Sequence, residues 1–223
     1  MAELTVYHGS EHIVEKPEYG KGSKYNDYGL GFYCTEHIEL AKEWACTTEH
    51  GGYANKYSLD IDRLSIMNLT GGEYNILNWL AILVENRTFS INADIKRAAK
   101  EYLLSHFLPD YKDYDVIIGY RADDSYFSFA NAFLSNGLSL AQLNRAMYLG
   151  DLGEQIVIKS KKAFGRLHYS GYEIAEKGIF LRKRQARDND AREAYRQESN
   201  HIAEGTYMID IIRQEWRNED VRL

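Results

Sequence analysis

Two short segments near the amino terminus combine residue types that can hold a flat ligand. The first is a β-type run over residues 4–7 that ends at His8-Gly9-Ser10, where glycine and serine interrupt the strand. The second is a glycine-rich stretch, Gly29 to Tyr33, which leads into a helix that carries Trp44 eleven residues after Tyr33. A lone histidine at a strand end is usually a hydrogen-bonded structural residue, and aromatic side chains either fill a core or stack on flat ligands. The spacing of these residues decides between the two interpretations.

The letters and the spacing resemble the ADP-ribosyltransferase superfamily, in its poly(ADP-ribose) polymerase and diphtheria-toxin branch. That branch has histidine and glycine followed by serine or threonine, here His8-Gly9-Ser10, and later G-x-G-x-Y, here Gly29 to Tyr33. In the polymerases an aromatic residue follows the tyrosine at the position of Trp44. The resemblance covers residues 5–46 well and residues 150–164 moderately. It extends to uncharacterised bacterial single-domain relatives, some of them suspected toxins of toxin–antitoxin pairs.

The resemblance implies that NAD is a co-substrate, and it gives the residues of the two segments their roles. Tyr33 and Trp44 are expected to hold the electron-poor nicotinamide ring between two aromatic faces. Gly9 lets the backbone approach the carboxamide, whose two hydrogen-bonding groups can pair with a backbone N–H and C=O. By position, His8 bonds the adenine-side ribose and Ser10 supports it.

The family takes its catalytic carboxylate from a late strand, and residues 153–158 fit that strand with Glu154 in the catalytic position. Cleavage of the bond between nicotinamide and ribose builds positive charge at the anomeric carbon, which an anionic side chain on the ribose hydroxyls stabilises. A shift of one residue places Gln155 there instead. Because neighbouring strand residues face opposite sides, only one of the two enters the cleft, and Glu154 is the preferred assignment. With Gln155 in the cleft, a slow transferase or a binding module is expected.

His8 and Tyr33 complete the expected catalytic set. The chain departs from the polymerases at Ala41, where they have a serine that binds nicotinamide, so one carboxamide hydrogen bond is missing from the pattern.

Two further polar clusters stand outside this pattern. Asp123 and Asp124 follow a predicted buried strand, and we expect them to contact an acceptor rather than a metal, because paired aspartates are common in turns and caps. Arg182-Lys183-Arg184, with Arg187, forms a dense basic run, and its acidic neighbours favour a solvated helix face over a phosphate site. We predict no metal site.

The predicted strands and helices that must position these residues do not alternate as βαβ units, which favours an α+β fold. We expect strands at about residues 4–7, 31–35, 55–66, 114–120, 154–160 and 167–172. A helical insertion is expected at about residues 71–108, and a C-terminal helical extension at about 173–223 with a break at Gly205. The resemblance implies a single domain over residues 1–223, with the split two-sheet antiparallel β core of the ADP-ribosyltransferase type.

The composition is that of a globular protein, with 44% hydrophobic and 27% charged residues in 223. The net charge of −6 excludes a basic field over the whole molecule that would attract nucleic acid. Two cysteines are too few for a disulfide scaffold or a four-cysteine zinc site, and no apolar run approaches the ~20 residues of a membrane span. A cytoplasmic protein with no membrane partner is therefore expected.

These expectations combine into one function, the transfer of ADP-ribose from NAD to an acceptor macromolecule, protein or nucleic acid, with release of nicotinamide. The resemblance to toxins implies an antitoxin protein as a further partner. Two alternatives remain open: a binding module for NAD or ADP-ribose without the chemistry, and a protein that acts only by binding a partner.

Overall fold

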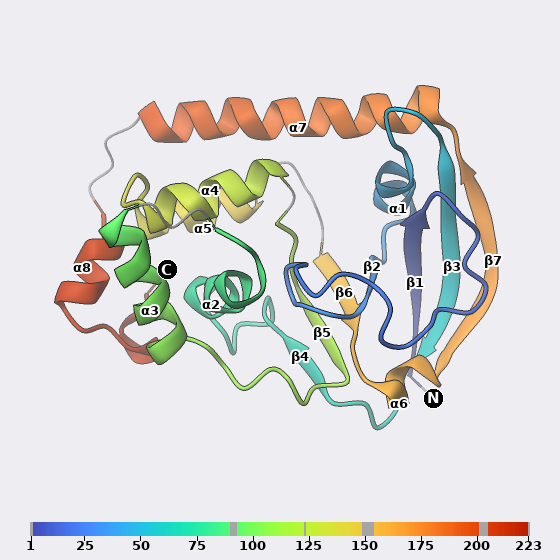
Figure 1. Ribbon diagram of the computed structural model, residues 1–223, viewed down its shortest axis with the longest axis horizontal. Helices are drawn as coiled ribbons and strands as arrows, with labels where there is room; N and C mark the ends of the chain where they lie inside the picture. Colours follow the sequence, from blue (N-terminus) through green and yellow to red (C-terminus); the bar gives the residue numbers. More distant parts are fainter. Residues whose placement is uncertain (1, 90–92, 123, 149–153, 201–204, 223) are drawn as a thin grey trace.

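The computed structural model describes residues 2–89, 93–122, 124–148, 154–200 and 205–222, and within these ranges two β-sheets are flanked by helices (Figure 1). The first sheet has the order β1-β3-β7 and is antiparallel, with β1 (Glu3–Ser10), β3 (Gly52–Asp60) and β7 (Leu167–Ala175). The second sheet has the order β2-β6-β5-β4, with β2 (Phe32–Cys34), β6 (Glu154–Ile158), β5 (Val116–Tyr120) and β4 (Ile66–Asn68). Its pairs are antiparallel except that β4 runs parallel to β5.

The two sheets share an apolar core and are joined along one edge. Side chains of β1 and β3 pack in one cluster with side chains of the second sheet, namely Val6, Tyr57, Leu59, Cys34, Ile156 and Ile158. Tyr7 and Thr35 exchange two backbone hydrogen bonds, of 2.8 and 3.0 Å. This bridge places the end of β1, which carries His8, beside β2, which carries Tyr33.

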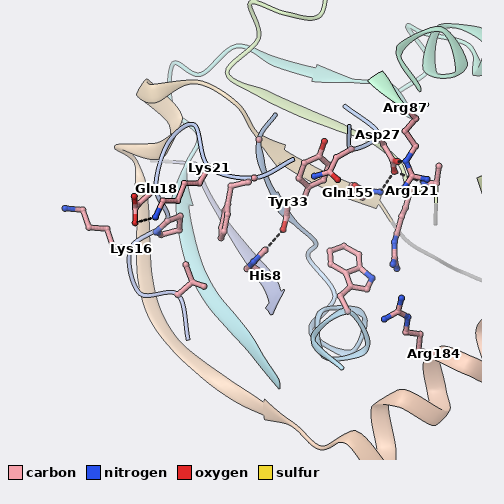
Figure 2. A pocket seen from close by; sticks show the side chains of 18 residues that line it. His8, Lys16, Glu18, Lys21, Asp27, Tyr33, Arg87, Arg121, Gln155 and Arg184 are labelled. Carbon is pink, nitrogen blue, oxygen red and sulfur yellow. Dashed lines mark hydrogen bonds and ion pairs between the residues drawn. The ribbon is translucent and has the colours of Figure 1, made fainter. Parts of the chain in front are cut away.

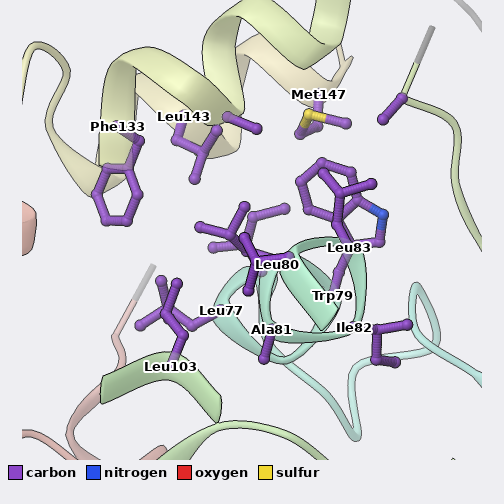
Figure 3. Packing of buried hydrophobic residues seen from close by; sticks show 14 of the residues in the cluster. Leu77, Trp79, Leu80, Ala81, Ile82, Leu83, Leu103, Phe133, Leu143 and Met147 are labelled. Carbon is purple, nitrogen blue, oxygen red and sulfur yellow. The ribbon is translucent and has the colours of Figure 1, made fainter. Parts of the chain in front are cut away.

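A helical lobe packs on the other part of the second sheet. It consists of α2 (Ile76–Asn86), α3 (Asp94–His106), α4 (Asp124–Leu134) and α5 (Leu140–Tyr148). Residues 76–84 of α2 are all buried, and Figure 3 shows Leu103, Phe133 and Leu143 packed around this helix. A helix that is apolar on every side must be covered on every side, so α2 forms the centre of the lobe. The expectation of helices within residues 71–108 is confirmed.

Two further helices lie outside this lobe, one on the first sheet and one along the length of the molecule (Figure 1). α1 (Ile38–Ala45) packs on β1 and β3, and α7 (Lys177–Asn200) is a long helix that runs from α1 to α4 (Figure 1). Glu43 of α1 is only 2% exposed and accepts two hydrogen bonds from Arg187 of α7, of 3.0 and 3.1 Å. This contact fixes the first half of α7 against α1. The shorter elements are α6 (Lys161–Phe164), α8 (Met208–Arg213) and a 3₁₀ turn (Asn218–Asp220).

The α+β class is confirmed, while some expected boundaries were wrong. The strand expected over residues 55–66 is two strands, because β3 ends at Asp60 and the chain turns through Arg63, which has a φ of 59°, before β4. β1 continues past Tyr7 to Ser10, because its last residues pair with β3. The core is two open, mostly antiparallel sheets, and the parallel pairing of β4 departs from the expected antiparallel core.

Candidate functional site

A pocket of about 630 Å³ lies where β1, β2, α1 and β6 meet (Figure 2). Its walls include His8 from β1, Tyr33 from β2, Trp44 from α1 and Gln155 from β6. The segment between β1 and β2, residues 11–31, supplies much of the remaining wall. Side chains from distant parts of the sequence therefore line one hollow, and its size is typical of sites for small molecules and cofactors.

His8 is held in one tautomer by the neighbouring strand. Its Nδ1 lies 2.7 Å from the backbone oxygen of Tyr33, and a carbonyl oxygen can only accept, so Nδ1 carries the hydrogen. Burial lowers the pKa of His8 below its usual 6.5, although the bond to Tyr33 opposes this shift. The ring also contacts Phe32, with 4.3 Å between centroids. His8 is therefore neutral at neutral pH, and its Nε2 is an acceptor.

Tyr33 anchors the segment that precedes it. Its hydroxyl donates to the Gly29 carbonyl at 2.6 Å and accepts from the Tyr28 backbone N–H at 3.1 Å. Burial raises the pKa of Tyr33 far above its usual value of 10, so the phenol stays protonated. The phenol thus fixes the end of the 11–31 segment at the pocket wall, while its ring remains part of the lining.

Trp44 presents both an aromatic face and an unpaired donor. The guanidinium of Arg121 lies 4.5 Å from the centre of its indole ring, a cation–π contact. The indole Nε1 is buried and has no hydrogen-bond partner among the described residues. A buried donor without a partner is uncommon in folded proteins. Trp44 and Tyr33 both line the pocket, as expected. The expected clamp of two open aromatic faces is not seen, because the Arg121 guanidinium covers a face of Trp44.

Gln155, and not Glu154, reaches the pocket. Gln155 is 5% exposed and lines the hollow, whereas Glu154 is absent from the lining and accepts a hydrogen bond from the Thr70 hydroxyl. The register explains the difference: Tyr33 pairs with Val157, so strand alternation places Gln155 on the same face as Tyr33 and Glu154 on the other. The preference for Glu154 in the cleft was wrong in this respect.

A buried carboxylate that the sequence patterns did not indicate lies directly behind Gln155. Asp27 accepts hydrogen bonds at Oδ2 from Gln155 Nε2 and from the Ala122 backbone N–H, each 2.9 Å long. Its Oδ1 lies 3.0 Å from Arg87 Nε as an ion pair, although without hydrogen-bond geometry. Burial raises the pKa of Asp27, and Arg87 opposes the rise most strongly. The signal in the sequence was the long irregular loop that contains Asp27, since such loops are uncommon unless functional.

Cationic side chains outnumber anionic ones around the pocket. Among the described residues, five cationic side chains line it against two carboxylates. These are Lys16, Lys21, Arg87, Arg121 and Arg184, with Glu18 and Asp27. Arg184 comes from α7, where its Nη1 donates to the Cys46 carbonyl at 3.1 Å. The basic run on α7 is therefore not simply a solvated face, because it sends one guanidinium to the pocket and another, Arg187, to Glu43.

Gly9 and Ser10 lie beside the pocket without lining it. A Cβ at Gly9 would be 2.0 Å from the Ala41 carbonyl oxygen, so glycine is required there for the close packing of β1 against α1. The Ser10 hydroxyl accepts from Asn55 Nδ2 at 3.1 Å. The Asn55 amide, which is fully buried, also bonds the carbonyl of His8 and the backbone N–H of Val14. Asn55 thus holds the chain that leaves β1, a role that its sequence position did not reveal.

The acidic pair after β5 cannot be placed. Asp123 lies outside the described residues, and so does the side chain of Asp124. Among the residues that the structure describes, no group of three or more His, Cys, Asp or Glu side chains is arranged to hold a metal ion.

The chain matches a protein family over residues 4–169, described as a protein of unknown function, DUF3990. Because this match spans most of the chain, the protein belongs to that family. No curated protein and no solved structure matches the chain. The family region runs from β1 into β7 and includes the pocket residues from the two sheets, while α7 and its Arg184 lie beyond it. In the described part of the chain, no helix has the length and apolar character needed to cross a membrane.

Proposed function

We propose that this pocket binds NAD and that the protein transfers ADP-ribose from NAD to an acceptor macromolecule. The observation that carries the proposal is the convergence of His8, Tyr33, Trp44 and Gln155 on one hollow. The motif resemblance selects the first three of these residues from the sequence alone, and it offers the fourth as an alternative to Glu154. On this proposal the two-sheet core is that of an ADP-ribosyltransferase.

The chemistry of the walls suits the parts of NAD. The nicotinamide ring is flat and cationic, and Trp44 offers an aromatic face that already holds a cation, the guanidinium of Arg121. A pyridinium that stacks there replaces this contact. The acceptor Nε2 of neutral His8 suits a ribose hydroxyl, and the surplus of cationic side chains suits the two phosphates. A neutral or cationic ligand gains nothing from that surplus.

The reaction that we propose breaks the bond between C1′ of the ribose and the nicotinamide nitrogen. The electron pair of the bond leaves with the nitrogen, so the pyridinium departs as neutral nicotinamide and positive charge develops on C1′. A nucleophilic oxygen or nitrogen of the acceptor then bonds to C1′ and loses its proton to solvent. Because the side chain at the ribose is an amide, Gln155, rather than a carboxylate, we expect slow turnover.

The experiment that tests the proposal combines binding with product release. Isothermal titration calorimetry of the purified protein with NAD is expected to give saturable binding, and chromatography is expected to show nicotinamide accumulating faster than in a protein-free sample. The matched control is Asp94→Asn, which removes a 98% exposed carboxylate that does not line the pocket and should match the wild type. Failure of NAD to bind the wild type refutes the proposal.

A second candidate, a binding module for NAD or ADP-ribose without chemistry, is favoured by one observation, the amide of Gln155 where a carboxylate was expected. It predicts the same binding isotherm with no nicotinamide release above the protein-free sample. The two measurements together therefore separate the candidates.

A further inference from the structure

We propose that Asp27 is a positioning residue that acts through Gln155, so that the two side chains together replace the single catalytic carboxylate expected on β6. This inference rests on the proposed function and deepens it, because it assigns the source of the negative charge at the ribose. Its basis is the hydrogen bond of 2.9 Å from Gln155 Nε2 to Asp27 Oδ2.

The first step is the orientation of the Gln155 amide. An ionised carboxylate can only accept, so the end of the amide that meets Asp27 must be the NH₂ group. The carbonyl Oε1 then occupies the other branch of the planar amide, and no hydrogen bond from the described residues reaches it. Since Gln155 lines the pocket, Oε1 is the atom that it offers to a ligand. An acceptor at this point can receive the ribose hydroxyl hydrogen as a carboxylate oxygen would.

The second step is the charge behind the amide. Asp27 is 5% exposed, and in such surroundings its charge is screened much less than at the surface. A negative charge at the NH₂ end polarises the amide and makes Oε1 a stronger acceptor, as in other buried hydrogen-bond chains. The Arg87 ion pair and the Ala122 N–H stabilise the ionised form of Asp27. Oδ2 already accepts two hydrogen bonds and Oδ1 is buried beside Arg87, so Asp27, although it lies at the pocket wall, influences the ligand through Gln155.

The third step is rigidity. The segment that carries Asp27 is held at the next residue, because the Tyr28 hydroxyl donates to the Tyr120 carbonyl at 2.6 Å and Lys159 Nζ donates to the Tyr28 carbonyl at 2.7 Å. The Tyr33 hydroxyl holds the next residue, Gly29, at 2.6 Å. A group that is already oriented before charge develops at C1′ stabilises the transition state without reorganising. The described contacts therefore orient the pair in the absence of ligand.

We call the action of Asp27 on the ribose through Gln155 the relay. It is tested with a double-mutant cycle on nicotinamide release at saturating NAD. Asp27→Asn keeps the shape of the side chain but removes the charge, and an Asn amide no longer dictates which end of Gln155 faces the pocket. We expect kcat to fall about 10- to 100-fold, below the full effect of losing a direct transition-state contact, while the Kd for NAD changes less than about threefold. Asp94→Asn is the control for loss of a carboxylate and should leave kcat unchanged.

The second arm moves the charge to the other member of the pair. Gln155→Glu alone places two carboxylates within hydrogen-bond distance, where they share one proton and carry one net charge, so kcat should stay within about threefold of the wild type. Asp27→Asn/Gln155→Glu exchanges amide and carboxylate, and kcat should recover at least tenfold relative to Asp27→Asn. This strong coupling is not expected if Asp27 only supports the fold. If Gln155→Glu changes kcat by the same factor in the wild type and in Asp27→Asn, the relay is overturned.

The thermal midpoint of each variant is measured by circular dichroism, because Asp27→Asn leaves Arg87 without its partner. If that variant does not fold, Asp27→Asn/Arg87→Gln removes both charges and leaves no buried charge unpaired, and it should show the same fall in kcat. A wild type that releases nicotinamide with Asp27 variants of equal kcat refutes the relay alone. A wild type that releases none refutes the transfer reaction and the relay together. Loss of kcat in Glu154→Gln with none in Asp27→Asn assigns the charge to Glu154 and overturns the relay.

Discussion

The contact between α1 and α7 gives a prediction that does not depend on the identity of the ligand. Glu43 of α1 is 2% exposed and receives both Nε and Nη2 of Arg187, at 3.0 and 3.1 Å. Arg187→Met keeps a long side chain but removes the guanidinium, so a buried carboxylate loses a two-pronged partner. Breaking a buried pair by removal of one member costs about 3–5 kcal/mol, mainly because the remaining charge stays desolvated.

The size of the effect can be compared with a neighbouring pair on the same helices. In a chain of this length a loss of 1 kcal/mol lowers the thermal midpoint by about 2–4 °C, so Arg187→Met should lower it by about 6–20 °C. Lys183→Met removes the 2.5 Å ion pair with Glu39, whose side chains are 48% and 52% exposed. Exposed pairs contribute about 1 kcal/mol or less, so this control should lower the midpoint by less than about 4 °C.

Thermal unfolding followed by circular dichroism measures both variants, and hydrogen exchange reports whether α7 separates first. Glu43→Leu/Arg187→Met should recover most of the loss, because it removes the unpaired charge. A midpoint for Arg187→Met that equals that of Lys183→Met refutes the claim that this pair fixes α7. Since α7 carries Arg184 to the pocket, Arg187→Met should also weaken NAD binding.

Two further predictions concern the pocket, and a third concerns the packing of β1 beside it. Trp44→Leu removes the aromatic face that is proposed to hold the nicotinamide ring. The loss of about 0.5–2 kcal/mol of cation–π attraction should raise the Kd for NAD, measured by calorimetry, about 2- to 30-fold. An unchanged Kd contradicts stacking on Trp44. The lowered pKa of His8 means that the stability from its neutral form is complete above pH 6.5 and is lost as the pH falls through that lowered pKa, where NAD binding should weaken too. Binding by the wild type that does not change from pH 7 down to the pH at which the protein unfolds contradicts the acceptor role. Gly9→Ala forces a Cβ to 2.0 Å from the Ala41 oxygen, so urea unfolding should show a loss of more than about 3 kcal/mol, and a loss below 1 kcal/mol contradicts the close packing of β1 on α1.

The sequence indicated those parts of the site that are close along the chain. His8, Tyr33 and Trp44 occur in consecutive elements, so their spacing reflects local structure, and the structure brings all three to one pocket. The choice between Glu154 and Gln155 was not accessible in the same way. It depends on the register of β6 against β2, which a strand pattern with two possible faces does not contain.

The charged part of the site could not be predicted, for a related reason. Asp27, Arg87, Arg121 and Arg184 come from loops and from a helix beyond the family region, and they meet only after the chain has folded. A long irregular loop indicates a functional segment, but the sequence does not show which of its charged residues is buried and which is solvated. The apolar run of α2 was recognised as helical, but its burial on all sides requires the helices that surround it.

The most direct test of the central claim is a crystal structure of the protein with an NAD analogue whose bond between the ribose and the pyridine ring cannot be cleaved. The account predicts the pyridine ring against Trp44, with a ribose hydroxyl within hydrogen-bond distance of Gln155 Oε1 and the phosphates beside the arginines of the pocket. Electron density for the analogue at any other place on the protein, or a pyridine ring that lies away from both Tyr33 and Trp44, would contradict it.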